Sequence, residues 1–136
     1  MKIVFDTNVL FAAFVARNGL CAKIVEEGLA GHEIFLSQFI LSEFARCLEQ
    51  KAGIDKTHIE NAIESLVSVA RIVVPAQISA NVIRDHNDTA ILGTALASHA
   101  DALVSGDKDL LILGSFETIP IVSPRQFFDR FLSERR

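Results

Sequence analysis

The sequence predicts an α/β protein with a parallel sheet that is covered by helices on both faces. Five short apolar segments, at residues 2–5, 33–36, 71–74, 102–104 and 119–122, alternate with longer segments of helical periodicity. Such alternation is typical of parallel strands joined by helices. The first segment is apolar after its lysine and stops at Asp6, as expected for a strand buried on both faces. We therefore expect five strands in a three-layer α/β/α arrangement.

The helical segments have recognisable starts and ends. Asn18-Gly19 separates the first two, Ser37 and Asp55 are suitable N-caps, and Gly53 ends the helix that Ser37 begins. Pro120 in the last strand predicts a position at the edge of the sheet. The expected helices cover residues 9–14, 38–52, 89–99, 110–113 and 124–132, with a helical turn at 79–84. Two more helices are expected, one after Gly19 that runs to about residue 30 and one after Asp55 with apolar residues at helical spacing up to Val67.

Composition limits the functional classes. The chain has 136 residues, a net charge of −4 and no block of basic residues, so strong non-specific binding to nucleic acid is not expected. Divalent cations in an acidic cleft can nevertheless reverse the local charge. The two cysteines are isolated and favour core positions over a disulfide or zinc site.

The sequence also gives an expectation about location. No apolar run approaches the length of a membrane span. The chain leads from Met1 directly into the first strand and leaves no room for a signal peptide. We therefore expect a soluble, cytoplasmic protein that does not contact a membrane.

Four acidic residues lie where an α/β sheet holds its ligands. Asp6 and Asp107 follow the first and fourth strands, and Asp88 opens the helix that leads into the fourth strand. Glu43 belongs to the helix after the second strand. If the first and fourth strands are neighbours at the topological switch point, these carboxylates enter one crevice.

Four carboxylates in one crevice imply a divalent cation. Like charges at close range raise pKa values and leave some of the groups protonated. Oxygen ligands favour hard ions such as Mg²⁺, with Mn²⁺ as an alternative. One or two ions would serve, and two ions about 4 Å apart suit in-line displacement at phosphorus.

Each acid also has a local explanation. Asp6 can be a turn residue, Asp88 can stabilise the first turn of a helix, and Asp107 and Asp109 can be solvated loop residues. Glu43 can form a surface ion pair with Arg46 at i+3. The hypothesis of a metal site therefore depends on the joint placement of the acids.

Four motifs in order resemble those of PIN-domain nucleases, especially the toxin-like members of bacterial and archaeal toxin–antitoxin pairs. The resemblance covers nearly the whole chain. The motifs begin with Asp6-Thr7-Asn8 and continue with the segment 37–43, which ends at Glu43. They are completed by 85–88 before an Ala- and Leu-rich helix and by Ser105-Gly106-Asp107-Lys108-Asp109.

The resemblance implies roles for individual residues. The metal-binding and catalytic residues would be Asp6, Glu43, Asp88 and Asp107, with Asn8 and Ser105 as auxiliary residues and Asp109 as a possible fifth carboxylate. Ser105 stands where threonine is common and Leu110 where an aromatic residue is common, and neither difference removes a ligand.

The resemblance also implies a fold and an activity. Residues 1–136 would form a single PIN-like domain with strand order 3-2-1-4-5. The activity would be Mg²⁺- or Mn²⁺-dependent cleavage of RNA phosphodiester bonds by a toxin that an antitoxin protein holds in check. By analogy with the family we also expect a homodimer.

Two other functions stay open from the sequence. A PIN-like module could bind RNA or a partner protein with little or no catalysis. A phosphatase of the haloacid-dehalogenase type also places an aspartate after its first strand, but its chemistry needs Asp-x-Asp and the second position here is Asn8.

Overall fold

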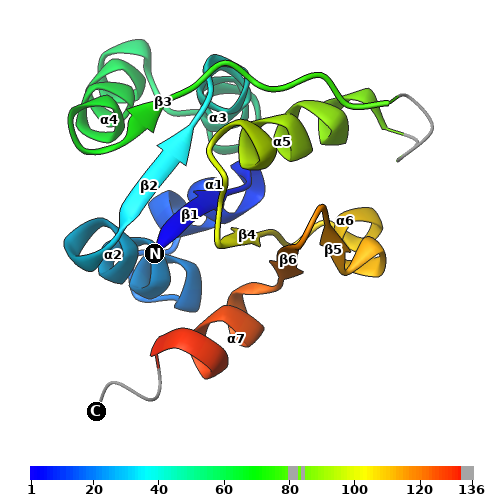
Figure 1. The fold of residues 1–136 in the computed structure, drawn as a ribbon. Coiled ribbons are helices and arrows are strands. Elements are labelled where there is room, and N and C mark those ends of the chain that lie inside the picture. The colour runs from blue at the N-terminus through cyan, green and yellow to red at the C-terminus, as the bar shows by residue number, and fades with distance from the viewer. Residues whose placement is uncertain (80–82, 84, 133–136) are drawn as a thin grey trace.

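The computed structural model describes residues 1–79, 83 and 85–132, and it confirms an α/β fold around a central parallel sheet (Figure 1). Within these residues the sheet has the order β3-β2-β1-β4-β6-β5. The strands are Lys2–Phe5 (β1), Glu33–Leu36 (β2), Arg71–Ile72 (β3), Ala102–Val104 (β4), Ser115–Phe116 (β5) and Ile119–Val122 (β6). The parallel strands reproduce the expected order 3-2-1-4-5.

The expected count of five strands is wrong, because a sixth strand lies at one edge. β5 pairs antiparallel with β6, which makes β5 and not β6 the edge strand. The turn between them places Glu117 and Thr118 at positive φ, 50° and 72°. Two-residue hairpin turns of this kind usually contain glycine or asparagine, so the sequence carries no recognisable turn signal here.

β1 lies at the centre of the sheet, between β2 and β4. Val4 is opposite Phe35 on one side and Leu103 on the other. The side chains of Ile3, Val4 and Phe5 are completely buried, as expected for a strand covered on both faces. Helices cover both faces of the sheet, which gives the three expected layers.

β3 is shorter than the expected segment 71–74. The Val73 amide still donates to the Leu36 carbonyl at 2.9 Å, but Val74 is 86% exposed and Pro75 has no amide hydrogen. The chain then turns toward the next helix, where the Ala76 amide donates to the Gly93 carbonyl at 2.9 Å. The proline therefore ends the strand earlier than its apolar sequence suggests.

The helices of the described chain occupy the expected segments. They are Thr7–Val15 (α1), Leu20–Gly31 (α2), Gln38–Ala52 (α3), Lys56–Val69 (α4), His86–Ala97 (α5), Lys108–Leu113 (α6) and Pro124–Phe127 (α7), and a π-helical turn, η1, covers Phe128–Leu132. The expected helical turn at 79–84 falls largely outside the described residues. No single helix in the described chain is long and apolar enough to span a membrane. Only when α1 and α2 are taken together do length and composition reach what a membrane span requires, and a bend of 107° separates the two helices.

Three helices begin two or three residues earlier than expected, because an aspartate caps each of them. Asp6 accepts a hydrogen bond from the Thr7 amide at 2.6 Å, and Asp85 accepts one from the Asn87 amide at 2.9 Å. Asp107 accepts from the Asp109 and Leu110 amides at 2.8 and 3.3 Å. Side-chain acceptors of this kind satisfy the unpaired amides of a first helical turn.

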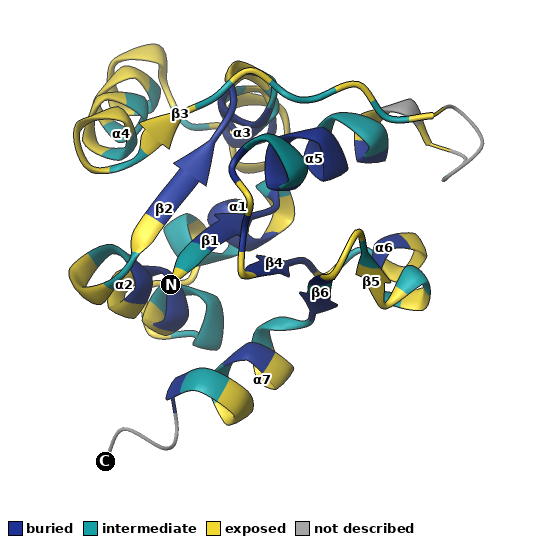
Figure 2. Ribbon diagram, in the orientation of Figure 1, coloured by how far each residue is buried: buried dark blue, intermediate teal, exposed yellow. Residues whose placement is uncertain are grey.

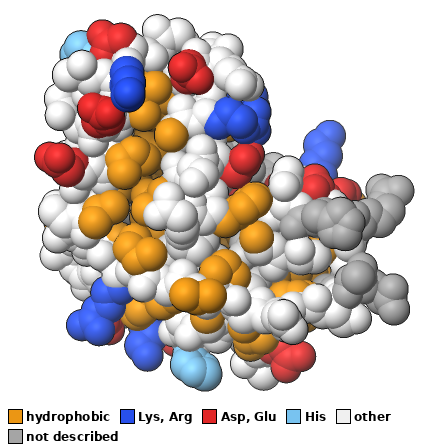
Figure 3. All heavy atoms as spheres, turned by 90° about the horizontal axis from the view of Figure 1, so that it is seen from above, with side chains coloured by type: hydrophobic (Ala, Val, Ile, Leu, Met, Phe, Trp, Pro, Cys, Tyr) orange, Lys and Arg blue, Asp and Glu red, His pale blue; other side chains and the backbone are white. Residues whose placement is uncertain are grey.

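The core lies around β1 and β4, and α4 packs against its outside through partly buried residues such as Ile59, Ile63 and Leu66. Figure 2 shows β1, β4 and β6 in the colour of buried residues, whereas α4 is exposed or intermediate throughout. None of the residues of α4 is buried, although its apolar residues repeat at helical spacing. Viewed from the side of α4, β3 and α5, the surface carries a band of apolar side chains between charged ones (Figure 3).

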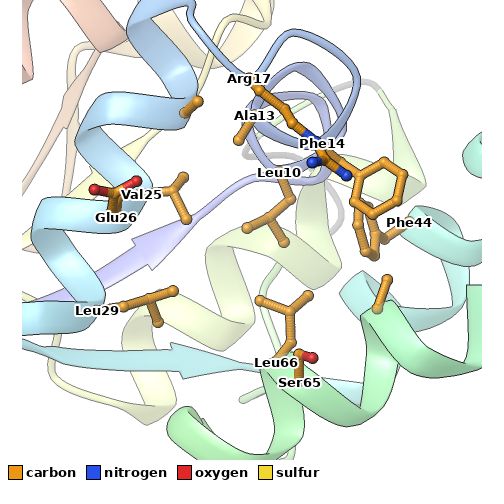
Figure 4. A pocket seen from close by; sticks show the side chains of 12 residues that line it. Leu10, Ala13, Phe14, Arg17, Val25, Glu26, Leu29, Phe44, Ser65 and Leu66 are labelled. Atoms are coloured by element: carbon orange, nitrogen blue, oxygen red, sulfur yellow. The ribbon is translucent and has the colours of Figure 1, made fainter.

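An apolar groove lies between α4 and three other helices. It has a volume of about 430 Å³ and is lined by residues of α1, α2, α3 and α4. Leu10, Val25, Leu29 and Leu66 form its walls, with Phe14 and Phe44 at one end (Figure 4). The rings of Phe14 and Phe44 pack edge to face with centroids 6.2 Å apart. We call this feature the apolar groove.

Candidate functional site

Asp6 is fixed at the carboxyl end of β1 by hydrogen bonds to both of its oxygens. Oδ1 accepts from the Thr7 amide, and Oδ2 accepts from the Ser105 hydroxyl at 2.7 Å and from the Asn8 amide group at 3.4 Å. The residue is only 6% exposed. Burial raises the pKa of Asp6 and the nearby Asp107 raises it further, while the hydrogen bonds from Ser105, Thr7 and Asn8 act in the opposite direction.

Ser105 and Asn8 connect the ends of β1 and β4. The completely buried Ser105 hydroxyl donates to Asp6 and accepts from the Asp107 amide at 2.9 Å. The Asn8 carbonyl oxygen accepts from the Gly106 amide at 3.1 Å. Both side chains therefore hold Asp6 and Asp107 in a fixed relation, which is an orienting position of the kind expected for the two auxiliary residues.

Asp88 lies in the first turn of α5 and is 5% exposed. Its Oδ2 atom is buried and has no hydrogen-bond partner in the described structure. Burial is the main cause that raises the pKa of Asp88 to about 7, and the charges of Asp107, Asp85, Asp6 and Asp109 add to it. An unpartnered carboxylate oxygen among four other acids is costly unless a proton or a cation joins it.

The carboxylates meet in one cleft of about 250 Å³. We call it the acidic cleft, defined by its five acidic residues Asp6, Glu43, Asp85, Asp88 and Asp107. Carboxylate oxygens of Asp88, Asp107 and Asp109 lie within 4.8 Å of one another, although Asp109 is exposed and lies outside the residues that line the cleft. Asp6 is close enough to act on the pKa of Asp88.

Glu43 lines the cleft but is engaged differently. Its Oε1 accepts from Arg46 Nη2 at 2.6 Å and its Oε2 from Arg46 Nε at 3.4 Å. The local interpretation of Glu43 as half of an ion pair with Arg46 is therefore correct in this structure. The two interpretations of Glu43 are compatible, because the ion pair itself lies along the wall of the cleft.

A buried pair of hydroxyls fixes the helices that carry Glu43 and Asp88. The Thr94 hydroxyl on α5 donates to the hydroxyl of Ser37, the N-cap of α3, at 2.9 Å. Both residues are completely buried. The amino end of α3 and the body of α5 are thereby tied together beside the cleft.

The donor set fits a hard divalent cation. All the candidate ligands are carboxylates, which Mg²⁺ and Mn²⁺ prefer over softer nitrogen and sulfur ligands. The unpartnered Oδ2 of Asp88 is a buried oxygen that such an ion would satisfy. The residues best placed to hold it are Asp88 and Asp107, with Asp6, Asp109 and Glu43 around them.

Sequence reasoning missed several residues of the cleft. The Thr7 hydroxyl is buried without a hydrogen-bond partner, and Phe11 and Phe39 form an apolar part of the wall. Arg46 and Lys51 are the cations that line the cleft within the described chain. Arg46 was expected from the sequence as the i+3 partner of Glu43 but not as part of the cleft, and nothing in the sequence shows that Lys51 reaches the same cleft.

Comparison with known proteins supports the architecture. A family model described as "PIN domain" matches residues 2–109. The uncharacterized protein MJ1680 of Methanocaldococcus jannaschii is 29% identical over 147 residues, covering 96% of this chain and 92% of that protein.

Three solved structures share the fold at low identity. VapBC2 from Rickettsia felis, bound to a DNA fragment from their promoter, has a TM-score of 0.66 at 16% identity, covering 90% of this chain and 98% of that one. VapBC-1 from nontypeable Haemophilus influenzae has a TM-score of 0.66 at 17% identity, covering 92% and 99%. PAE2754 from Pyrobaculum aerophilum has a TM-score of 0.64 at 14% identity, covering 98% and 90%.

The family model spans most of the chain, and the motifs on which the resemblance rested lie within the matched residues. The fold, the order of the parallel strands and the arrangement of acids at the ends of β1 and β4 agree with this match. The chain therefore belongs to the PIN-domain family.

Proposed function

We propose that this protein is a metal-dependent endoribonuclease that uses Asp6, Glu43, Asp88 and Asp107 to bind one or two Mg²⁺ or Mn²⁺ ions. PIN domains are generally nucleases, which supports a hydrolase acting on phosphodiester bonds. The observation that carries the proposal is the convergence of these acids on one cleft, with a buried Asp88 oxygen that has no partner. Metal dependence and the choice of RNA as substrate are the parts that experiment must establish.

The chain's own residues define how the site would act. A bound divalent ion would supply positive charge to a phosphodiester and make a water molecule more acidic. Ser105 and Asn8 keep the Asp6 carboxylate from rotating, and the cap on α6 fixes one oxygen of Asp107. The protein thus contributes prearranged negative charge at Asp6 and Asp107.

The test is cleavage of defined RNAs in Mg²⁺, in Mn²⁺ and in chelator by the parent chain and by Asp107→Asn. Asp101→Asn is the matched control, because Asp101 precedes β4 and Asp107 follows it. We expect cation-dependent cleavage that Asp107→Asn abolishes and Asp101→Asn retains, with circular dichroism unchanged in both. Full activity of Asp107→Asn would refute the assignment, and RNA binding without cleavage by the parent would favour the binding-module alternative.

The position of Asn8 argues against the phosphatase alternative. Asn8 occupies the position of the second aspartate, and its side chain bridges Asp6 and the Gly106 amide. Its amide therefore has a structural partner on each side. A phosphoaspartate trapped on Asp6 would be the result that revives this alternative.

We further propose that the protein is the toxin of a toxin–antitoxin pair in the cytoplasm, where RNA is available. The similarity to structures described as VapBC, together with the PIN-domain match, supports an antitoxin partner. The apolar groove beside α4, with a volume of about 430 Å³, offers a partner an apolar site that the described chain leaves uncovered. We also propose that the free protein is a homodimer, for which ultracentrifugation at micromolar concentrations is the test.

A further inference from the structure

We propose that Arg46 is a positioning residue shared between Glu43 and the substrate: it holds Glu43 in the resting protein and moves to a backbone phosphate when RNA binds. The inference rests on the proposed function, since it concerns how RNA enters the acidic cleft. It adds a residue that no sequence motif assigned to the site.

The geometry of the ion pair is that of a guanidinium fork. Arg46 and Glu43 lie one turn apart on α3, and Nη2 and Nε donate to the two oxygens of Glu43 at 2.6 and 3.4 Å. A third nitrogen, Nη1, donates to the Gln50 side chain at 3.1 Å. Planar, two-pronged donation of this kind suits a carboxylate and a phosphate equally well.

The pair can exchange partners because it lines the cleft and is open to water. The Arg46 side chain is 48% exposed and the Glu43 side chain 25% exposed. An ion pair this open to water contributes little stability and breaks at low cost. Arg46 can therefore leave Glu43 without disturbing α3, whose buried residues lie on its other face.

The charges of the cleft create a need for such a residue. Five acidic side chains and only two cations, Arg46 and Lys51, line the cleft within the described chain. The whole chain carries a net charge of −4. A polyanion that approaches the acids therefore meets repulsion, except along α3, where Arg46 and Lys51 supply the positive charge.

A coupling between cation and substrate follows. While Arg46 holds both oxygens of Glu43, it competes with any cation for that carboxylate. When a phosphate takes the guanidinium, Glu43 becomes available to the cation. By linkage, each of the two ligands then favours the binding of the other.

The test is Arg46→Gln, measured in two binding assays without reference to turnover. Calorimetric titration with Mn²⁺ in the absence of RNA should show tighter binding, by about three- to ten-fold, because the competitor for Glu43 is gone. Titration with a short single-stranded RNA in chelator should show weaker binding by a similar factor. The slope of log affinity against log salt should fall by about 0.7, the value for one phosphate contact on a single strand.

The matched control is Arg71→Gln. Arg71 also pairs with a glutamate, Glu33, at 3.6 Å. This pair lies at the amino ends of β2 and β3, whereas Asp6 lies at the carboxyl end of β1. We expect neither affinity to change in this variant. Arg46→Lys keeps the charge without the fork and should restore most of the salt slope but only part of the RNA affinity.

The outcomes separate the interpretations. Loss of both affinities in Arg46→Gln would show a merely structural role, and no change in either would show a passive surface ion pair; both results overturn the proposal. If the parent binds RNA but does not cleave it, the proposed catalytic function fails while the opposite shifts in Arg46→Gln still support the exchange. If Asp107→Asn abolishes cleavage and Arg46→Gln leaves both affinities unchanged, only the exchange fails.

Discussion

Replacing Asp88 with asparagine should make the metal-free protein more stable than the parent at high pH. With a cation bound, the parent should be the more stable of the two. The pKa of Asp88 is raised from 3.8 to about 7 by burial and by the neighbouring acids. The folded state therefore holds this proton more tightly than the unfolded state. The parent chain is expected to lose stability as the pH rises from about 4 to about 7, since above that range the buried group is ionised.

The size of the effect follows from the pKa. A rise of about three pKa units at 1.36 kcal/mol per unit sets a ceiling of roughly 4 kcal/mol. The cleft is open to water, which screens the charges, and about half of that ceiling is a realistic expectation. Asp88→Asn should therefore gain about 2 kcal/mol relative to the parent between pH 4.5 and pH 8.

The assay is urea denaturation in chelator at steps across this pH range, repeated with saturating Mn²⁺. The ion should stabilise the parent by about 3 kcal/mol at a hundred times its dissociation constant, and the variant by much less, so the order of stability inverts. Asp55→Asn is a control in which the change in stability should have the opposite sign. Hydrogen bonds from His58 lower the pKa of this exposed helix cap, so its ionised form stabilises the folded state and asparagine should be less stabilising at high pH. A variant that is less stable than the parent in chelator at every pH would refute the reasoning.

Two further substitutions test the scaffold of the site. Gly93→Ala should lower the free energy of unfolding, measured by urea denaturation, by about 1–3 kcal/mol, because the new Cβ would lie 2.3 Å from the Ala76 carbonyl oxygen. This loss should outweigh the better helix propensity of alanine. Unchanged stability would mean that the segment before α5 can move away. Ser105→Ala removes the buried hydroxyl that donates to Asp6 and should destabilise the chelated protein by about 1–3 kcal/mol, more at pH 8 than at pH 5, because the pKa of Asp6 rises further. Ser105→Thr keeps the hydroxyl and should behave like the parent, and equal losses in both variants would point to packing instead of hydrogen bonding.

The fold was predictable because its main signals are local. Short apolar strands and periodic helices are visible in the sequence, and the strand order follows the family resemblance. The β5–β6 hairpin was not predictable, because its turn uses Glu117 and Thr118 in a backbone conformation that these residues rarely adopt. Pro75 marks the end of β3 in the sequence, but that the strand already stops at Ile72, with the Ala76 amide bound to Gly93 on α5, depends on packing between distant segments.

The convergence of the acids on one cleft was predictable from the sequence, and the contacts around them were not. Asp6, Asp88 and Asp107 could be placed together because each lies at an end of a strand or the start of a helix. The link from Ser105 to both Asp6 and Asp107 and the position of Lys51 depend on packing between distant segments. For Glu43 both interpretations were available from the sequence, and the structure adds that its ion pair with Arg46 lies on the cleft wall.

The caps at the acidic cleft have a consequence for how the protein matures. Helices α1 and α5 begin there, at Asp6 and Asp85, so their amino ends direct the positive ends of their dipoles, about half an elementary charge each, toward the crowded acids. This positive potential offsets part of the repulsion among the acids, and the raised pKa values of Asp88 and Asp6 act in the same direction, because each favours the uncharged carboxyl group when no cation is bound. A chain that folds without an ion would then bind the proposed cation after folding, so the two steps could be controlled separately.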